Sequence, residues 1–139
     1  GLDLEDFLDL LDQLLLYTQY YGLVPGSIET WNVVIDGKDV SLSEFPVAAV
    51  VGMAKRSKAN YKMRGHQVIA INTHWMLVKA VNFIKKLLPG NGAQKLHLLS
   101  GYDYLSTLIE NDRLEQKYGG THPDIVDTFW PPMFNPHTK

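Results

Sequence analysis

Hydrophobic positions near the start of the chain predict a helix followed by a strand. Over residues 3–21, leucine and phenylalanine recur every three to four positions, which places them on one face of an amphipathic helix. Carboxylates are concentrated in the first turns of this segment, where they interact favourably with the positive end of the helix dipole. The Pro25-Gly26 pair then indicates a turn. Residues 31–35 are short and mostly apolar, so they are predicted to form a buried strand.

A second helix and a second strand are expected in the middle of the chain. The helix would begin at a cap supplied by Ser41 or Ser43 and end near Lys58, with basic residues at the end of the helix dipole that favours them. Residues 67–72, with the sequence Gln-Val-Ile-Ala-Ile-Asn, are predicted to form the second strand.

The third predicted helix, residues 74–88, is apolar around nearly its whole circumference and ends at Pro89. Such a helix is either buried on several sides, or it covers an apolar cavity and meets a membrane. Residues 95–99 are predicted to form a third short strand, and residues 102–111 a last helix.

The predicted order of elements is α-β-α-β-α-β-α. Short apolar strands separated by helices of this length imply right-handed crossovers, so the predicted fold class is α/β, with a largely parallel sheet covered by crossover helices. We expect residues 1–128 to form one domain, because 139 residues are few for two. Residues 129–139 hold three prolines and are predicted to form an extended C-terminal tail.

Charge is strongly segregated along the chain. Residues 45–102, the basic segment, carry nine cations and no anion, while the flanks hold all 15 acids and four cations. This asymmetry predicts an anionic partner, such as a phosphate or an anionic membrane surface. Nucleic acid is not expected, because the cations alternate with long apolar runs rather than with exposed aromatic residues. The alternative is that acidic helices fold back and neutralise the basic segment.

The composition and the known motifs exclude several classes of site. The chain has no cysteine, which rules out disulfide scaffolds, thiolate zinc sites and cysteine nucleophiles, and fits a reducing, cytoplasmic location. It contains no Gly-x-Ser-x-Gly, Walker or His-Glu-x-x-His sequence, and its five histidines lie at no metal-ligand spacing. No apolar run is long enough to span a bilayer. We therefore expect no catalytic residue and no metal site.

Five features of the sequence occur in a recognisable order. They are Trp31-Asn-Val-Val-Ile-Asp36-Gly37, residues 61–72 followed by Trp75, the third helix ending in Leu88-Pro89, Gln94-Lys95-Leu96, and Leu114-x-x-x-Tyr118-Gly119-Gly120-Thr121. Together they resemble the CRAL-TRIO lipid-binding domain, the fold of the secretory-pathway phosphatidylinositol transfer proteins and of the retinaldehyde and tocopherol carriers. The resemblance covers about residues 3–125.

The resemblance implies a non-enzymatic protein, peripherally associated with membranes, that binds and transfers a hydrophobic ligand, in the first place a phospholipid. The sheet would floor a cavity, and the helix at 74–88 would be a mobile gate. No cofactor is expected, since the bound lipid is the ligand. Lys95 falls where phosphatidylinositol-binding members keep a lysine for the headgroup phosphate. The other positions that the resemblance places on the cavity wall are Trp31, Val33, Ile35, Val68, Ala70, Leu77, Val81, Ile84 and Leu98.

The chain also departs from the pattern of that family. Members that bind phosphatidylinositol have Tyr-Pro-Glu before the second strand, whereas this chain has Tyr61-Lys62-Met63 and so lacks the acidic contact to the inositol. The usual N-terminal helical lobe and first strand are missing. We therefore expect a fragment or an unusually short, N-terminally truncated member, with an open sheet edge through which two copies can pair as a homodimer.

Three other interpretations of the sequence stay open. A protein-interaction module of STAS-like architecture would share the β-α-β-α order, with Val34-Ile35-Asp36 before its serine turn, but the usual Asp-Ser-Ser-Gly is absent. A family scaffold could have lost its cavity to large side chains, for which Trp31 and Trp75 are the candidates. An α/β enzyme would need a convergent catalytic group that the sequence does not reveal.

Overall fold

The computed structural model describes residues 3–41, 46–87 and 91–127, without the side chains of Val81, Asn82 and Ile84. The predicted tail at 129–139 and the candidate cap Ser43 lie outside these residues.

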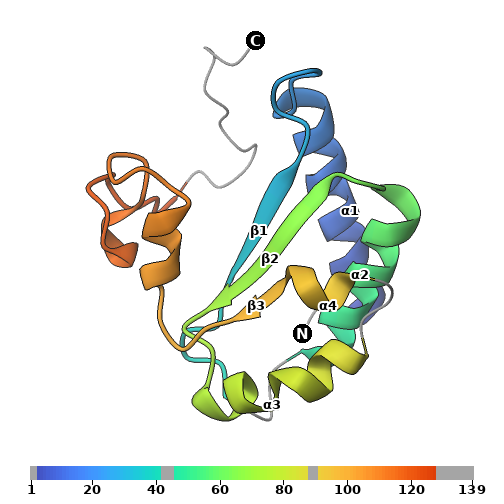
Figure 1. Cartoon of the computed structure of the whole chain (residues 1–139). Helices are drawn as coiled ribbons and strands as arrows, with labels where there is room; N and C mark the ends of the chain where they lie inside the picture. Colours follow the sequence, from blue (N-terminus) through green and yellow to red (C-terminus); the bar gives the residue numbers. More distant parts are fainter. Residues whose placement is uncertain (1–2, 42–45, 88–90, 128–139) are drawn as a thin grey trace.

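The three predicted strands form one parallel sheet in the order β1-β2-β3. The strands are β1, Trp31–Asp36, β2, Gly65–Ile71, and β3, Leu96–Leu98. In the register, Val33 pairs with Val68, and Ala70 pairs with Leu98. The predicted α/β fold class is therefore confirmed, and Figure 1 shows the strands running side by side through the middle of the molecule.

Within the described ranges, four α-helices accompany the sheet. They are α1, Leu4–Tyr21, α2, Val47–Asn60, α3, Trp75–Lys86, and α4, Gly92–Lys95. The Asp3 carboxylate caps α1 by accepting hydrogen bonds from the backbone N–H groups of Glu5 and Asp6, at 2.7 and 3.0 Å. α2 begins at Val47, later than predicted. Pro46 occupies its N-cap position, and a proline disfavours helical conformation in the residue before it.

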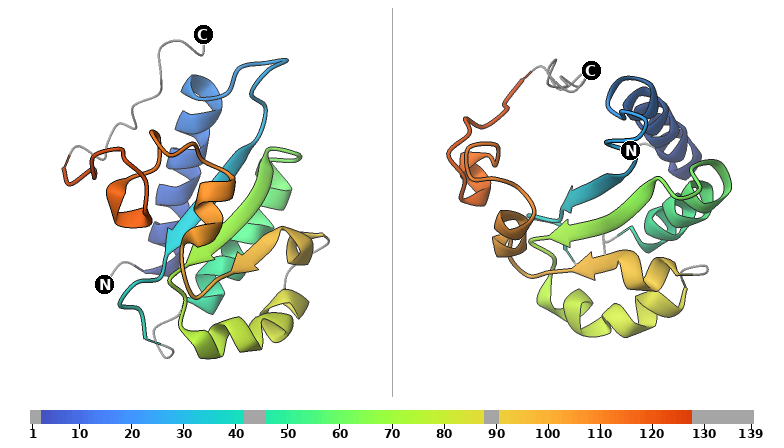
Figure 2. Two further views of the ribbon diagram at one scale, coloured as in Figure 1. Left: turned by 60° about the vertical axis from the view of Figure 1, so that its left-hand side comes forward. Right: turned by 45° about the horizontal axis from the view of Figure 1, so that its top comes forward.

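The sheet separates two layers, which Figure 2 shows on opposite sides of the strands. α1 and α2 lie on one side, and the C-terminal segment, residues 103–127, lies on the other. We call the side that carries Val33, Val68 and Ala70 the helical face, and the side that carries Ile69 and Ile71 the C-terminal face. In the part of the chain that the structure describes, no helix is both long and apolar enough to cross a bilayer.

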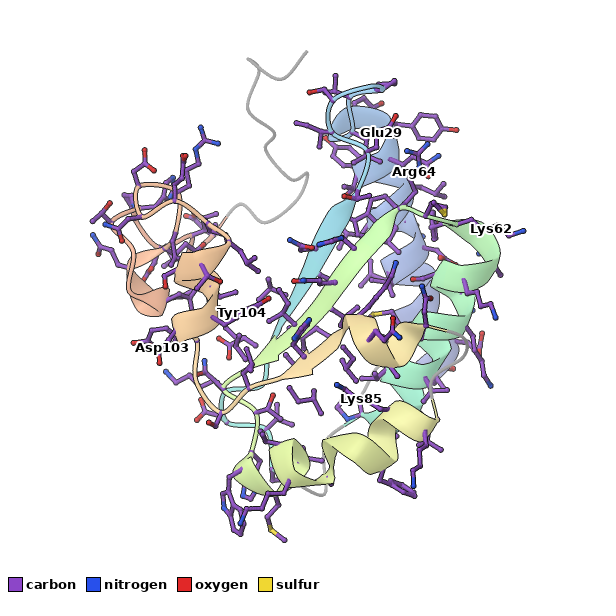
Figure 3. The ribbon with its side chains drawn as sticks, in the orientation of Figure 1. Glu29, Lys62, Arg64, Lys85, Asp103 and Tyr104 are labelled. Atoms are coloured by element: carbon purple, nitrogen blue, oxygen red, sulfur yellow. The ribbon has the colours of Figure 1, made fainter. Side chains whose placement is uncertain are left out.

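The C-terminal face is closed by irregular structure rather than by the α-helix predicted at 102–111. That prediction is wrong, because η2, Asp103–Thr107, is a 3-10 helix. The Ser106 and Thr107 hydroxyls donate to the carbonyls three residues earlier, both at 2.7 Å, and such bonds compete with α-helical ones. Leu105 is fully buried against Ile69, and the Tyr104 ring stacks on His97 of β3. Figure 3 shows Tyr104 on the C-terminal segment, beside the sheet.

A polar cluster of Asp36, Asn72 and Tyr118 joins the C-terminal segment to the ends of β1 and β2. η3, Gln116–Tyr118, presents the Tyr118 hydroxyl, which donates to Asp36 Oδ2 at 2.9 Å, and Asn72 Nδ2 donates to Asp36 Oδ1 at 2.9 Å. Burial raises the pKa of Asp36, but the hydrogen bonds from Asn72, the Lys38 N–H and Tyr118 outweigh it, so the pKa lies below its usual value. The paired glycines follow directly, and Gly119 has a φ of 86°, which favours glycine.

Candidate functional site

A cavity of about 420 Å³ lies between the helical face of the sheet and the helices α1, α2 and α4. Most of its wall is apolar. The apolar side chains include Leu11 and Leu15 from α1, Val50, Met53 and Ala54 from α2, and Trp31, Val33 and Val68 from the sheet.

Local structure explains how these side chains converge. Leu11 and Leu15 are one helical turn apart, so α1 presents them on the same side. Trp31 and Val33 are two residues apart on β1, which puts both on the helical face, and the parallel register sets Val68 beside Val33. The buried ring of Tyr61, just after α2, meets Trp31 edge to face, with ring centroids 5.7 Å apart.

Three lysines border the cavity, and no acidic side chain lines it in the described residues. Lys58 and Lys62 come from the C-terminal end of α2 and the turn after it, and Lys95 comes from the end of α4. Figure 3 shows Lys62 on the outer side of the molecule beyond α2. Lys95 is half-buried, and its Nζ donates to the backbone carbonyl of Gly65 at 2.5 Å. Because this acceptor is neutral, the ammonium charge of Lys95 is left uncompensated by it.

Positive charge elsewhere in the basic segment is partly neutralised by α1. Arg56 on α2 makes ion pairs of 2.6, 2.7 and 2.9 Å with Glu5, Asp9 and Asp12. The hydrogen bonds to Asp9 and Asp12 raise the pKa of the guanidinium. The fold-back of an acidic helix therefore accounts for Arg56, but within the described residues it supplies no ion pair to the three lysines at the cavity.

The predicted site residues divide into two groups along the sheet. Trp31, Val33, Val68 and Lys95 line the cavity at the amino-terminal ends of the strands. Four other predicted residues do not line the cavity. They belong to a packed cluster nearer the carboxyl ends of the strands, namely Ile35, Ala70, Leu77 and Leu98. The side chains of Val81 and Ile84 lie outside the described residues. The role of each of these residues in ligand contact stays a prediction.

α3, the predicted gate, lies below the carboxyl ends of the strands in Figure 1. Among the described side chains of α3, Leu77 is buried in the packed cluster, whereas Phe83 is 66% exposed. Trp75 is 55% exposed and does not line the cavity, so it does not fill this space as the lost-cavity interpretation would require. Lys79 Nζ lies over the Trp75 ring, 4.7 Å from its centroid.

Several lining residues were not singled out from the sequence. Leu11 and Leu15 belong to the apolar stripe of the first helix, which the sequence predicts only as one face of an amphipathic helix. Lys58 and Lys62 belong to the basic segment and are four residues apart, so a helical continuation would have placed them on one side. That spacing was the available signal for a basic border to the cavity.

Comparison with known proteins agrees with this geometry. The model of the CRAL/TRIO domain matches residues 3–120, a range that contains all three strands and every residue that lines the cavity. Proteins of this family are generally non-enzymatic and bind lipophilic ligands. No match to a curated protein was found. The chain belongs to the CRAL/TRIO domain family.

Proposed function

We propose that this protein is a non-enzymatic carrier that binds a lipid, in the first place a phospholipid, and exchanges it at membranes. The observation that carries the proposal is the cavity itself, an apolar space of about 420 Å³ with lysines at its border. Each methylene of an acyl chain that moves from water into such a space contributes about 0.8 kcal/mol. A lipid of the secretory-pathway phosphatidylinositol transfer type is one candidate ligand. However, the acid that would contact the inositol is replaced by Met63, which is 89% exposed.

Lys95 is the residue we propose for the headgroup. Its ammonium group borders the cavity, and its hydrogen-bond partner is the neutral Gly65 carbonyl, so it can pair with a phosphate oxygen. Lys58 and Lys62 lie on the same border and add positive potential there.

We propose that α3 acts as the gate at the membrane. It contacts α4, whose residues Gly92 and Lys95 line the cavity, so movement of α3 would release this wall. Opening removes Leu77 from its buried place at a cost of about 1.5–3 kcal/mol. Insertion of the exposed Trp75 and Phe83 into a membrane offsets this cost, and each nearby cation contributes about 1 kcal/mol at an anionic surface.

Mass spectrometry of the full chain tests the carrier function. The protein is measured under native conditions and again after organic extraction, which identifies any lipid that travels with it. We expect one lipid per chain. Ala54→Phe places a large ring in the cavity from α2 and should abolish the bound lipid, while Ala59→Phe, at an exposed position of the same helix, should retain it.

Two results would count against the proposal. The first is a chain that carries no lipid and takes none from anionic vesicles. The second is equal lipid content in the two variants when circular dichroism shows that both are folded, because the lipid would then not occupy this cavity. Val68→Phe fills the same space from the sheet side and serves if Ala54→Phe does not fold.

A further inference from the structure

We infer that two copies of this chain pair through the open edge of β1, in an antiparallel register centred on Val34. The sheet then continues from one copy into the other, and the α1 helices of the two copies lie on the same side of it. This pairing is independent of the proposed function, since it uses the edge of the sheet and not the cavity.

The free edge of β1 is able to accept another strand. In the part of the chain that the structure describes, β2 pairs with one side of β1, and no strand pairs with the other side. An edge strand carries a row of N–H and C=O groups without strand partners, which proteins usually protect with lysine, with proline or by keeping the strand short. β1 has neither lysine nor proline and is six residues long, whereas β3 at the opposite edge has three. The β1 edge therefore lacks these protections.

Alternation along β1 determines which backbone groups reach this edge. The N–H groups of Trp31 and Gly37 both donate towards β2, to carbonyls at 2.9 Å. Successive residues of a strand direct their backbone groups to opposite sides, so the residues that turn theirs to the open edge are Asn32, Val34 and Asp36. The side chains of these three are exposed as well, and they lie on the C-terminal face of the sheet.

One register joins all of these outward groups between two copies. In an antiparallel pair around a two-fold axis, a residue on the axis faces the same residue of the second copy. With Val34 on the axis, Asn32 of each copy faces Asp36 of the other, so every outward group is paired. Such a pair makes about six hydrogen bonds between the chains, two for each facing pair. The Asn32 amide also lies beside the Asp36 carboxylate, so no like charges oppose each other.

A stripe of exposed apolar side chains on α1 lies beside the same edge. Phe7, Leu10, Leu14 and Tyr21 recur at helical spacing and are between 38% and 56% exposed. They lie on the side of α1 opposite to the carboxylates that bind Arg56 of α2. The right-hand view of Figure 2 shows α1 beside β1, and α2 further along the sheet towards β3. The stripe therefore faces outward, past the open edge of β1.

A two-fold axis through Val34 brings the stripes of the two copies together. The axis is perpendicular to the sheet, so rotation about it keeps the helical layer of each copy on the same side. The second α1 then runs antiparallel to the first, and the two stripes face each other across the axis. The second copy thus covers apolar side chains that a single copy exposes, while the strands supply directional hydrogen bonds.

Sedimentation velocity of the full chain at increasing concentration measures the pairing, and charges at Val34 test the register. Val34 is 41% exposed, so a charged side chain there has access to water without unfolding. Val34→Lys and Val34→Glu each place like charges opposite each other and should weaken self-association about tenfold. An equimolar mixture of the two variants should form a mixed dimer, because the facing charges then attract. Met76→Lys is the matched control, since Met76 is 44% exposed on α3.

A cross-link locates the axis directly. The chain has no cysteine, so Val34→Cys introduces a single thiol. Facing residues of a hydrogen-bonded antiparallel pair have Cα atoms about 5.5 Å apart, which lies within the range of a disulfide. Mild oxidation should convert Val34→Cys into a covalent dimer on a non-reducing gel, whereas Met76→Cys should stay monomeric. Leu10→Gln tests the α1 stripe, and it should weaken association about tenfold while circular dichroism stays unchanged.

Each outcome supports or overturns the pairing. A chain that is monomeric at every concentration overturns it, and if Trp130→Ser with Phe134→Ser then permits a dimer, the chain's own tail is the occupant of the edge. A dimer that Val34→Lys leaves intact, or that Val34→Cys does not cross-link, uses another surface and also overturns it. Loss of association in Leu10→Gln alone would assign the dimer to α1 and overturn the strand register. Lipid content should be equal in Val34→Lys and the wild type, because Val34 lies on the face opposite the cavity, so failure of the pairing leaves the carrier function standing.

Discussion

Substitution of Gly120 by alanine tests why the Tyr-Gly-Gly-Thr sequence takes its observed form. A Cβ at Gly120 would lie 1.9 Å from the Leu114 carbonyl oxygen and 2.4 Å from its carbon. Contact at about 3.4 Å is ordinary, so the two backbones must separate by about 1.5 Å, and no side-chain rotation can relieve the clash. The separation breaks the bonds from Gly120 N to the Glu115 carbonyl, 3.1 Å, and from His122 N to the Leu114 carbonyl, 2.9 Å.

The expected cost follows from these losses. Two backbone hydrogen bonds contribute about 1 kcal/mol each, and release of the buried Leu114 side chain adds about 2 kcal/mol. We therefore expect Gly120→Ala to lower the free energy of unfolding by about 4 kcal/mol, which corresponds to a fall in Tm of roughly 10–15 °C. Urea denaturation followed by circular dichroism and fluorescence measures the change.

Two other glycines, Gly101 and Gly119, are the controls for this measurement. At Gly101 an added Cβ meets only Asp103 Oδ2, at 3.8 Å, so Gly101→Ala should change stability by less than about 0.5 kcal/mol. Gly119→Ala should cost about 1 kcal/mol, because the φ of 86° is strained for alanine. A Gly120→Ala protein as stable as Gly101→Ala would refute the close approach of the two backbones. Ligand binding by the folded fraction should be unchanged, because this segment lies on the sheet face opposite the cavity.

Three further changes test other parts of the structure. Burial and the hydrogen bond to Asp36 raise the pKa of Tyr118 to about 12, so its contribution to stability is complete below about pH 10 and is lost as the pH rises towards 12. Tyr118→Phe should therefore reduce the alkaline fall in stability, measured by urea denaturation across that range, and an unaltered slope would contradict the assignment. Arg56→Gln should destabilise the packing of α1 on α2, and the difference from the wild type should shrink as sodium chloride is added; a salt-independent difference would argue against the ion pairs. Gly52→Ala places a Cβ 2.9 Å from Leu8 Cδ1 and should lower the free energy of unfolding by about 1 kcal/mol. In a Leu8→Ala background the same substitution should raise the free energy of unfolding, because alanine favours a helix more than glycine does. Additive changes in this double-mutant cycle would rule out the contact.

Regular elements could be predicted because each carries its own local signal. The apolar stripe of the first helix continues to its end, and the structure places α1 at Leu4–Tyr21 against a predicted 3–21. The strands are short apolar runs between turn signals, and β1 and β2 lie within two residues of the predicted bounds. The last predicted helix was wrong because the hydroxyls of Ser106 and Thr107 compete for backbone carbonyls, an effect that apolar spacing alone does not reveal.

The candidate site could be predicted only in part, because strand alternation tells which face a residue occupies and not what covers that face. Trp31 and Val33 alternate in the same way as Ile35, and all three were expected at the cavity. Only the first two line it, because Leu77 of α3 packs where Ile35 lies. The position of α3 along the strands depends on the loops that lead to it and on tertiary packing, neither of which leaves a periodic pattern in the sequence.

The division of the helical face between cavity and core places the cavity next to the packed cluster that the proposed gate helix contacts. Val68 and Leu96 belong to both regions, so cavity and packed cluster share a boundary that runs across β2 and β3. Among the described side chains of α3, Leu77 is buried in the cluster, and its burial contributes about 1.5–3 kcal/mol. In the gating proposed above, α3 would leave this cluster at a membrane surface, where exposed apolar and basic side chains gain new contacts. Under the proposed function, movement of α3 would reach the cavity through this boundary, because Leu96 belongs to the cluster that contains Leu77, and Val68 packs against that cluster.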